Sequence, residues 1–101
     1  MWETERRRNF LVTLNGIDCK EIYFGNVLQR IRKRKRLTLE VLGDFIGYST
    51  SNIQRWESNT HFPPHFACVV LMCEVLRCTV KERLDLEEAY YCTILRDRGL
   101  C

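Results

Sequence analysis

The segment from Gly47 to Asn59, GYSTSNIQRWESN, concentrates hydrogen-bonding side chains at helical spacing. At about 100° per residue, Ile53 and Trp56 fall on one side of a helix, and most of the polar residues fall on the opposite arc. The residues of this polar arc are Thr50, Ser51, Gln54, Arg55 and Ser58. Their hydroxyl, amide and guanidinium groups can exchange hydrogen bonds with base edges in the major groove of DNA. An ordinary solvated helix face is the competing interpretation, and this segment taken alone favours it.

A basic run precedes this segment: in RIRKRKR, Arg30 to Arg36, every residue but one is basic, although the net charge of the chain is only +3. A local basic stripe is the electrostatic footprint expected for a polyanion. A solvated charged face and a nuclear localisation signal are alternatives for a run of this kind.

Composition excludes several classes of protein. The 101 residues fit one domain, and the polar start and the lack of a long apolar run predict neither a signal peptide nor a membrane span. Six cysteines without a C-x-x-C pair are then expected to be reduced thiols in a cytoplasmic protein. His61, His65 and Cys68 have ligand-like spacing, but Cys68 lies in an apolar run. We therefore expect no metal site, no cofactor and, since no nucleophile–base set is evident, no enzyme.

Apolar periodicity predicts a row of helices. One begins at Phe24 and ends by Leu37; Thr38 caps a second, which Gly47 ends; Ser49 caps a third, running from about 49 to 57. The expected buried residues of the first two are Phe24, Val27, Leu28 and Ile31, then Leu39, Leu42, Phe45 and Ile46.

Three further helices are expected after the loop from Asn59. Pro64 should open one that runs to Leu76, because proline is favourable in the first turn. Thr79 to Glu82 is a capping box for the next, and Asp85 to Glu88 a second box that opens a separate C-terminal helix.

The N-terminal residues 9–24 have two interpretations. Asn15-Gly16 between two β-capable runs predicts a hairpin, which we prefer. The alternative is a helix opened by a capping box from Asp18 to Glu21.

The order of short capped helix, glycine turn and polar helix resembles the lambda-repressor-like, Cro-type (XRE-like) helix-turn-helix family. The residues that carry the resemblance are Leu28, Ile31, Arg32, Leu37, Thr38, Leu42, Ile46, Gly47, Ser49, Ile53, Trp56, Glu57, Pro64, Leu76 and Thr79. The resemblance implies a mainly α, five-helix domain, to which we add the N-terminal hairpin and the C-terminal helix. It covers residues 24–84, between an arm at 1–23 and a C-terminal helix at 85–101, in one domain.

The resemblance also assigns roles. The third helix would enter the major groove, with Thr50, Ser51, Gln54 and Arg55 as base-contacting residues. Phosphates would be held by Arg34, Arg36, Thr38, Ser49, Ser58, Asn59, Thr60 and His65, with Lys33 and Lys35 also free for phosphates. Arg32 and Glu57 would form a structural ion pair. Arg36 stands where the family often has glycine, and Leu39 where it often has a phosphate-binding glutamine.

The function expected is sequence-specific binding of double-stranded DNA by a transcriptional regulator, associated with the nucleoid. A homodimer on a palindromic operator would follow, its surface drawn from the N-terminal hairpin and from Tyr90, Tyr91, Ile94 and Leu95. The alternative is an antitoxin-like or other module that binds a second protein through the C-terminal helix.

Overall fold

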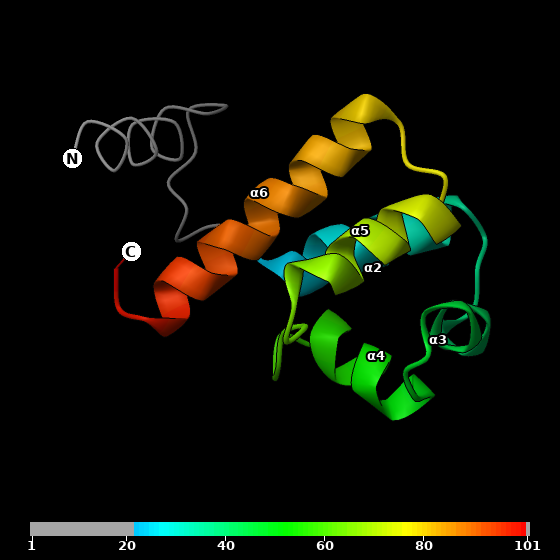
Figure 1. Cartoon of the computed structure of the whole chain (residues 1–101), viewed down its shortest axis with the longest axis horizontal. Coiled ribbons are helices and arrows are strands. Elements are labelled where there is room, and N and C mark those ends of the chain that lie inside the picture. The colour runs from blue at the N-terminus through cyan, green and yellow to red at the C-terminus, as the bar shows by residue number, and fades with distance from the viewer. Residues whose placement is uncertain (1–21, 101) are drawn as a thin grey trace.

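The computed structural model describes residues 22–100, which form five α-helices: α2 (Phe24–Arg34), α3 (Leu39–Ile46), α4 (Thr50–Glu57), α5 (Phe66–Val75) and α6 (Val80–Asp97) (Figure 1). This range contains no strand. The preferred hairpin and its helical alternative fall mainly on residues 9–21, which lie outside the described part of the chain. The mainly helical class is confirmed.

Local hydrogen bonds start three helices where the sequence predicts. The Thr38 hydroxyl accepts the Val41 N–H at 3.1 Å, and the Ser49 hydroxyl accepts the Asn52 N–H at 3.2 Å. Thr79 and Glu82 complete a reciprocal capping box. Because the first N–H groups of a helix have no partner within it, these side chains fix the starts of α3, α4 and α6.

Helix α2 starts differently, since Tyr23 at its N-cap makes no side-chain cap. Its first two N–H groups are accepted by distant residues: Phe24 N–H donates to the Thr93 hydroxyl at 3.3 Å, and Gly25 N–H donates to the Asn59 Oδ1 at 2.8 Å. The start of α2 is therefore capped by α6 and by the loop after α4, and not by its own N-cap residue.

Three helices of the described chain end in a left-handed residue that is not glycine. After α2, α4 and α5, this position is held by Arg36 (φ 60°), Asn59 (φ 65°) and Arg77 (φ 50°). At each end, paired backbone bonds close the helix; at α5 they run from Arg77 N–H to Glu74 O and from Cys78 N–H to Cys73 O. The geometry is that of a Schellman motif, whose left-handed residue is usually glycine. Both arginines therefore hold a strained backbone.

The core lies where all five helices meet: α2 packs against α4 and α6, α3 against α4 and α5, and α5 against α6. Helix α6 runs along one side of the bundle, and α3 and α4 lie at the other end (Figure 1). The fully buried large side chains come from every helix and include Phe24, Leu28, Ile31, Leu42, Ile53, Val69, Met72, Leu76 and Leu86.

The prediction of two C-terminal helices is wrong, because residues 80–97 form the single helix α6. The acidic stretch at Asp85 does not start a new helix. Glu82, Leu86, Ala89 and Tyr90 are all buried and lie on one helical stripe, so the same face packs on the core from the first turn onward.

Two smaller expectations also fail. Helix α5 begins at Phe66 rather than Pro64; Pro63 is buried, its carbonyl accepts the Tyr90 hydroxyl at 2.8 Å, and His65, with extended dihedral angles, is the N-cap. Phe45 is 70% exposed, because Leu42 and Ile46 form the buried face of α3 and Phe45 lies to one side of this face.

Candidate nucleic-acid interface

Helix α4 has eight residues and presents a narrow apolar side to the core. Ile53 and Trp56 are 0% and 3% exposed, and the Trp56 ring packs edge-on against Tyr48 at 5.0 Å between centroids. Ser51, Gln54 and Arg55 are exposed and Thr50 is half-buried. The residues expected to contact bases therefore share the outer face of α4.

The ion pair expected from the sequence is present. The Arg32 Nε and Nη2 atoms donate to the two Glu57 carboxylate oxygens at 2.5 and 2.9 Å, and its Nη1 donates to the Leu37 carbonyl at 2.8 Å. The side chains are 11% and 5% exposed. This two-pronged pair joins the last turn of α4 to α2 and to the chain that leads into α3, so it fixes the polar helix to its support.

Asn59 forms a second link between α4 and α2. Its Oδ1 accepts the Gly25 N–H at 2.8 Å, and its Nδ2 donates to Asn26 Oδ1 at 3.0 Å. Asn59, which the sequence predicts to bind phosphate, positions the loop through these two bonds. The spacing of residues within the chain gives no sign of this link, since 34 residues separate Asn59 from Gly25.

Glycine at position 25 is required by the close approach of the two segments. A Cβ atom there would lie 2.3 Å from the Trp56 carbonyl oxygen and 2.5 Å from that of Glu57. The last turn of α4 therefore rests directly on the backbone of α2.

The basic run is only partly available to a ligand. Arg34 Nη1 and Lys35 Nζ pair with the Glu82 carboxylate at 2.7 and 3.0 Å, which corrects the expectation that both cations are free. The Thr79 backbone N–H, followed by Lys35 and Arg34, lowers the pKa of Glu82 to about 2. Lys33 and Arg36 remain exposed.

The remaining residues assigned to phosphates lie at helix ends. Thr38 and Ser49 use their hydroxyls as caps and are exposed, and His65 is the exposed N-cap of α5. Ser58 donates to the Arg55 carbonyl or to Thr60, with the two hydroxyl oxygens of Ser58 and Thr60 2.9 Å apart. Ser58 and Thr60 thus form one polar corner at the end of α4.

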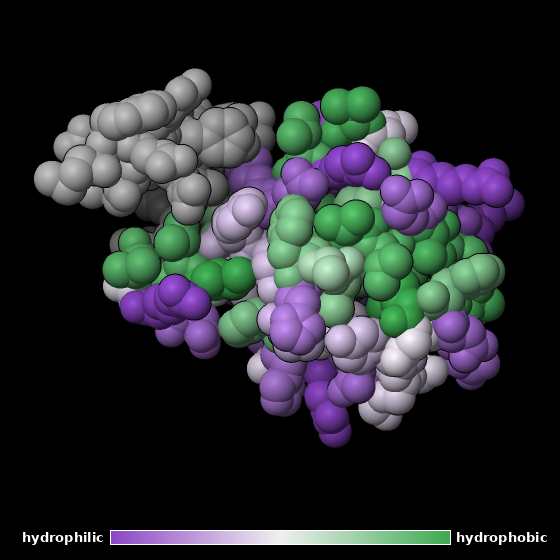
Figure 2. All heavy atoms as spheres, viewed as in Figure 1, coloured by the Kyte–Doolittle hydropathy of each residue, from purple (hydrophilic) through white to green (hydrophobic). Residues whose placement is uncertain are grey.

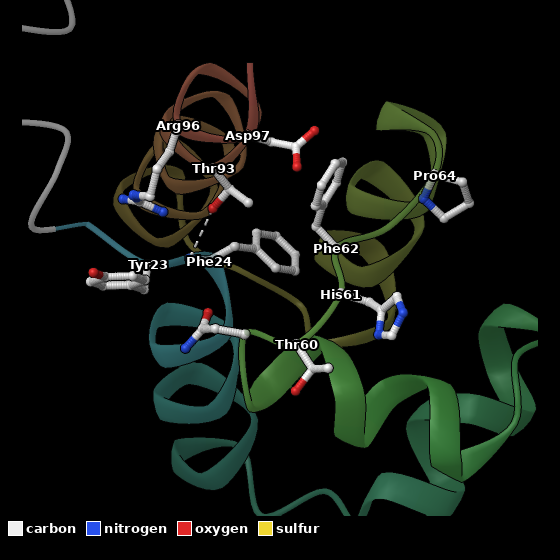
Figure 3. Close-up of a pocket in the computed structure, with 10 residues that line it drawn as sticks. Tyr23, Phe24, Thr60, His61, Phe62, Pro64, Thr93, Arg96 and Asp97 are labelled. Atoms are coloured by element: carbon white, nitrogen blue, oxygen red, sulfur yellow. Dashed lines mark hydrogen bonds between the residues drawn. The ribbon is translucent and has the colours of Figure 1, made fainter. Parts of the chain in front are cut away.

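A hollow of about 530 Å³ lies between the start of α2, the loop after α4 and the end of α6 (Figure 3). The Thr93 hydroxyl accepts a hydrogen bond from the Phe24 N–H, and the Arg96 guanidinium lies 4.2 Å from the centre of the Tyr23 ring. Arg96 also donates to the Ile22 carbonyl. These contacts fasten the last turns of α6 to the start of α2, so they have a structural role.

The four cysteines within residues 22–100 are buried or half-buried, as expected of residues that contribute to packing. Cys68 is buried, and its thiol lies 3.4 Å from the Tyr48 hydroxyl. It therefore packs in the core, although its spacing from His61 and His65 is that of a metal-ligand set. Burial raises the pKa of Cys73 to about 12, which disfavours the reactive thiolate. Among residues 22–100, no group of three histidine, cysteine or acidic side chains is arranged to hold a metal ion, and no helix is long and apolar enough to cross a membrane.

Comparison with known proteins agrees with this geometry. A helix-turn-helix domain family matches residues 24–86, which include α2 to α5 and the first turns of α6. Searches of curated proteins and of solved structures gave no significant match. The family match covers more than half of the chain and includes the consecutive short helices α3 and α4, so the protein belongs to the helix-turn-helix domain family.

Proposed function

We propose that this protein is a transcriptional regulator that binds double-stranded DNA at specific sequences through the outer face of α4. The observation that carries the proposal is the contrast within α4: Ile53 and Trp56 are buried, whereas Ser51, Gln54 and Arg55 are exposed side by side. Membership in the helix-turn-helix family supports it. A helix with this face fits the major groove, where arginine can pair with guanine through two bonds.

We propose that the exposed polar groups at helix ends, together with exposed basic side chains, bind the DNA phosphates. We assign this role to Thr38 and Ser49 at the helix starts, to the corner of Ser58 and Thr60, and to His65, with Lys33 and Arg36 as cations. Arg34 contributes less, because it is shared with Glu82. Each phosphate contact steepens the salt dependence by about 0.9 in log–log slope.

A homodimer on a palindromic site completes the proposal, since two-fold symmetry is the usual arrangement for this motif. Tyr90 does not belong to the dimer surface, because it is 3% exposed and donates to the Pro63 carbonyl. Tyr91 is 46% exposed and stays a candidate.

A second candidate function is a module that binds another protein through the C-terminal helix. The observation that favours it is the exposure of Val80 (79%) and Leu84 (54%) on α6. DNA binding that weakens steeply with salt supports the first function. A stoichiometric protein complex without such DNA binding supports the second.

Selection of bound sequences from random duplex DNA tests the proposal. The unaltered chain should recover a palindromic motif, and Gln54→Ala and Arg55→Ala should each lose preference at particular base pairs, by about 1–3 kcal/mol for a good two-bond contact. Gln29→Ala, on the exposed side of α2, is the matched control and should keep the motif. Recovery of unselected sequence by the unaltered chain would refute sequence-specific binding.

A further inference from the structure

Helix α5 ends in a turn that brings two cysteines together. The helix is apolar except for Glu74, and Figure 2 shows hydrophobic side chains gathered over it. Cys73 lies in its last turn, and Cys78 lies between its end and the start of α6. The Cys78 N–H donates to the Cys73 carbonyl at 3.0 Å, as in a Schellman motif. The side chains at these two positions of the motif commonly contact each other.

In this protein the two contacting side chains are thiols. The Cys73 S–H donates toward the Cys78 sulfur, and both side chains pack against the same core. Thiols that lie this close can be joined without a large movement of the backbone. Cys73 is 2% exposed, whereas Cys78 is half-buried. A reagent in solution therefore meets Cys78 first.

We propose that Cys73 and Cys78 form a reversible disulfide when the protein is exposed to hydrogen peroxide. The Cys78 sulfur attacks the peroxide, the O–O bond breaks, and Cys78 becomes a sulfenic acid as one water molecule leaves. The Cys73 sulfur then attacks the Cys78 sulfur, and the hydroxyl group leaves with the Cys73 proton as a second water molecule. The two sulfur atoms together give two electrons to the peroxide. A dithiol reductant restores both thiols by thiol–disulfide exchange.

The surrounding groups favour Cys78 as the first sulfur to react. Burial raises the pKa of both thiols, that of Cys73 to about 12. The hydrogen bond from Cys73 partly offsets this effect at Cys78. Nearby charges have smaller effects on the pKa of Cys78: Glu82 raises it, and Lys35 and Arg83 lower it. Because the thiolate is the nucleophile, oxidation is slow and begins at Cys78.

The disulfide would close the turn between α5 and α6, where the end of α2 is also held. Lys35 Nζ donates to the Arg77 carbonyl at 3.3 Å, and Arg77 is the left-handed residue of this turn. A covalent link across the short loop removes conformational freedom from the unfolded chain. We therefore expect the oxidised protein to melt several degrees above the reduced protein.

Peptide mapping of the folded protein tests the pair without DNA, so its outcome is independent of the proposed function. The protein is treated with hydrogen peroxide, its remaining thiols are blocked with iodoacetamide during denaturation, and the chain is cut with trypsin without reduction. Trypsin cuts after Arg77, which places the two cysteines in different peptides, residues 56–77 and 78–81. We expect these two peptides to be linked, with the blocking group on Cys68, and dithiothreitol should separate them.

Two variants locate the bond. Cys68→Ala should keep the linked peptides, because the Cys68 thiol lies against the Tyr48 hydroxyl. Cys78→Ser should abolish the link, leave the buried Cys73 as a thiol, and show no gain in melting temperature after peroxide treatment. The proposal is overturned if no link forms, if Cys78 becomes a sulfinic or sulfonic acid while Cys73 stays a thiol, or if either residue is linked to another cysteine. A linked protein that melts below the reduced one would also overturn it.

Discussion

Replacement of Gly25 by alanine should destabilise the protein, although alanine is the better helix former. Helix propensity alone predicts a gain of up to about 1 kcal/mol for the substitution. The structure predicts the opposite sign, because the added methyl carbon would lie 2.3, 2.5 and 2.7 Å from the Trp56 carbonyl, the Glu57 carbonyl and Asn59 Oδ1.

Two of these three atoms belong to the backbone, so α2 and α4 must move apart. Overpacking of this kind costs about 1–3 kcal/mol. Strain on the Gly25–Asn59 hydrogen bond adds about 0.5–1.5 kcal/mol. After the propensity gain of up to about 1 kcal/mol is subtracted, we expect the free energy of unfolding to fall by about 0.5–4.5 kcal/mol, which can be a large part of the total stability of a small domain.

Urea unfolding followed by circular dichroism at the helical band gives this quantity directly. Asn59→Ala is the matched comparison, since it removes the hydrogen bonds without the clash and should cost about 0.5–1.5 kcal/mol. DNA binding by Gly25→Ala should weaken as well, because α4 no longer rests on α2 in the same position. A Gly25→Ala protein as stable as the unaltered chain, or more stable, would refute the close approach of the two helices.

Three further predictions concern charges and helix ends. Glu57→Ala leaves Arg32 buried without its partner and should cost about 3–5 kcal/mol, measured by the same urea titration; an unchanged midpoint contradicts the ion pair. Arg77→Gly relieves a left-handed arginine (φ 50°) and should raise stability by about 1 kcal/mol, or the melting temperature by several degrees; a lower melting temperature would contradict the strain. Glu82 takes up its proton near pH 4.5 when free but at about pH 2 in the folded protein, so stability should fall as the pH is lowered through this window. Glu82→Gln should be less stable at neutral pH and should lose less on acidification; parallel curves would argue against this role.

The sequence predicts what depends on neighbours within a few residues. Thr38, Ser49 and Thr79 cap helices because each hydroxyl reaches an N–H three residues on, and the sequence shows that spacing. Ile53 and Trp56 were found by periodicity for the same reason. The Arg32–Glu57 pair spans 25 residues and came from family resemblance.

Contacts between distant segments cannot be predicted from local sequence patterns. Arg34 pairs with Glu82, which lies 48 residues away in the chain. The sequence alone therefore does not show which cations of the basic run are paired and which are exposed. The acidic stretch near Asp85 has the composition of a helix start, yet the buried stripe from Glu82 to Tyr90 keeps the helix intact. Which of two local possibilities occurs is decided by the core.

The short length of α4 has a consequence for how such proteins diversify. Eight residues are too few to remain helical alone, so the shape of this segment is imposed by its supports: Ile53, Trp56, Glu57 and the neighbouring Asn59. The side chains on its outer face take no part in that support. Under the proposed function, mutations at Ser51, Gln54 or Arg55 would change which DNA sequence is recognised while leaving the stability of the fold almost unchanged.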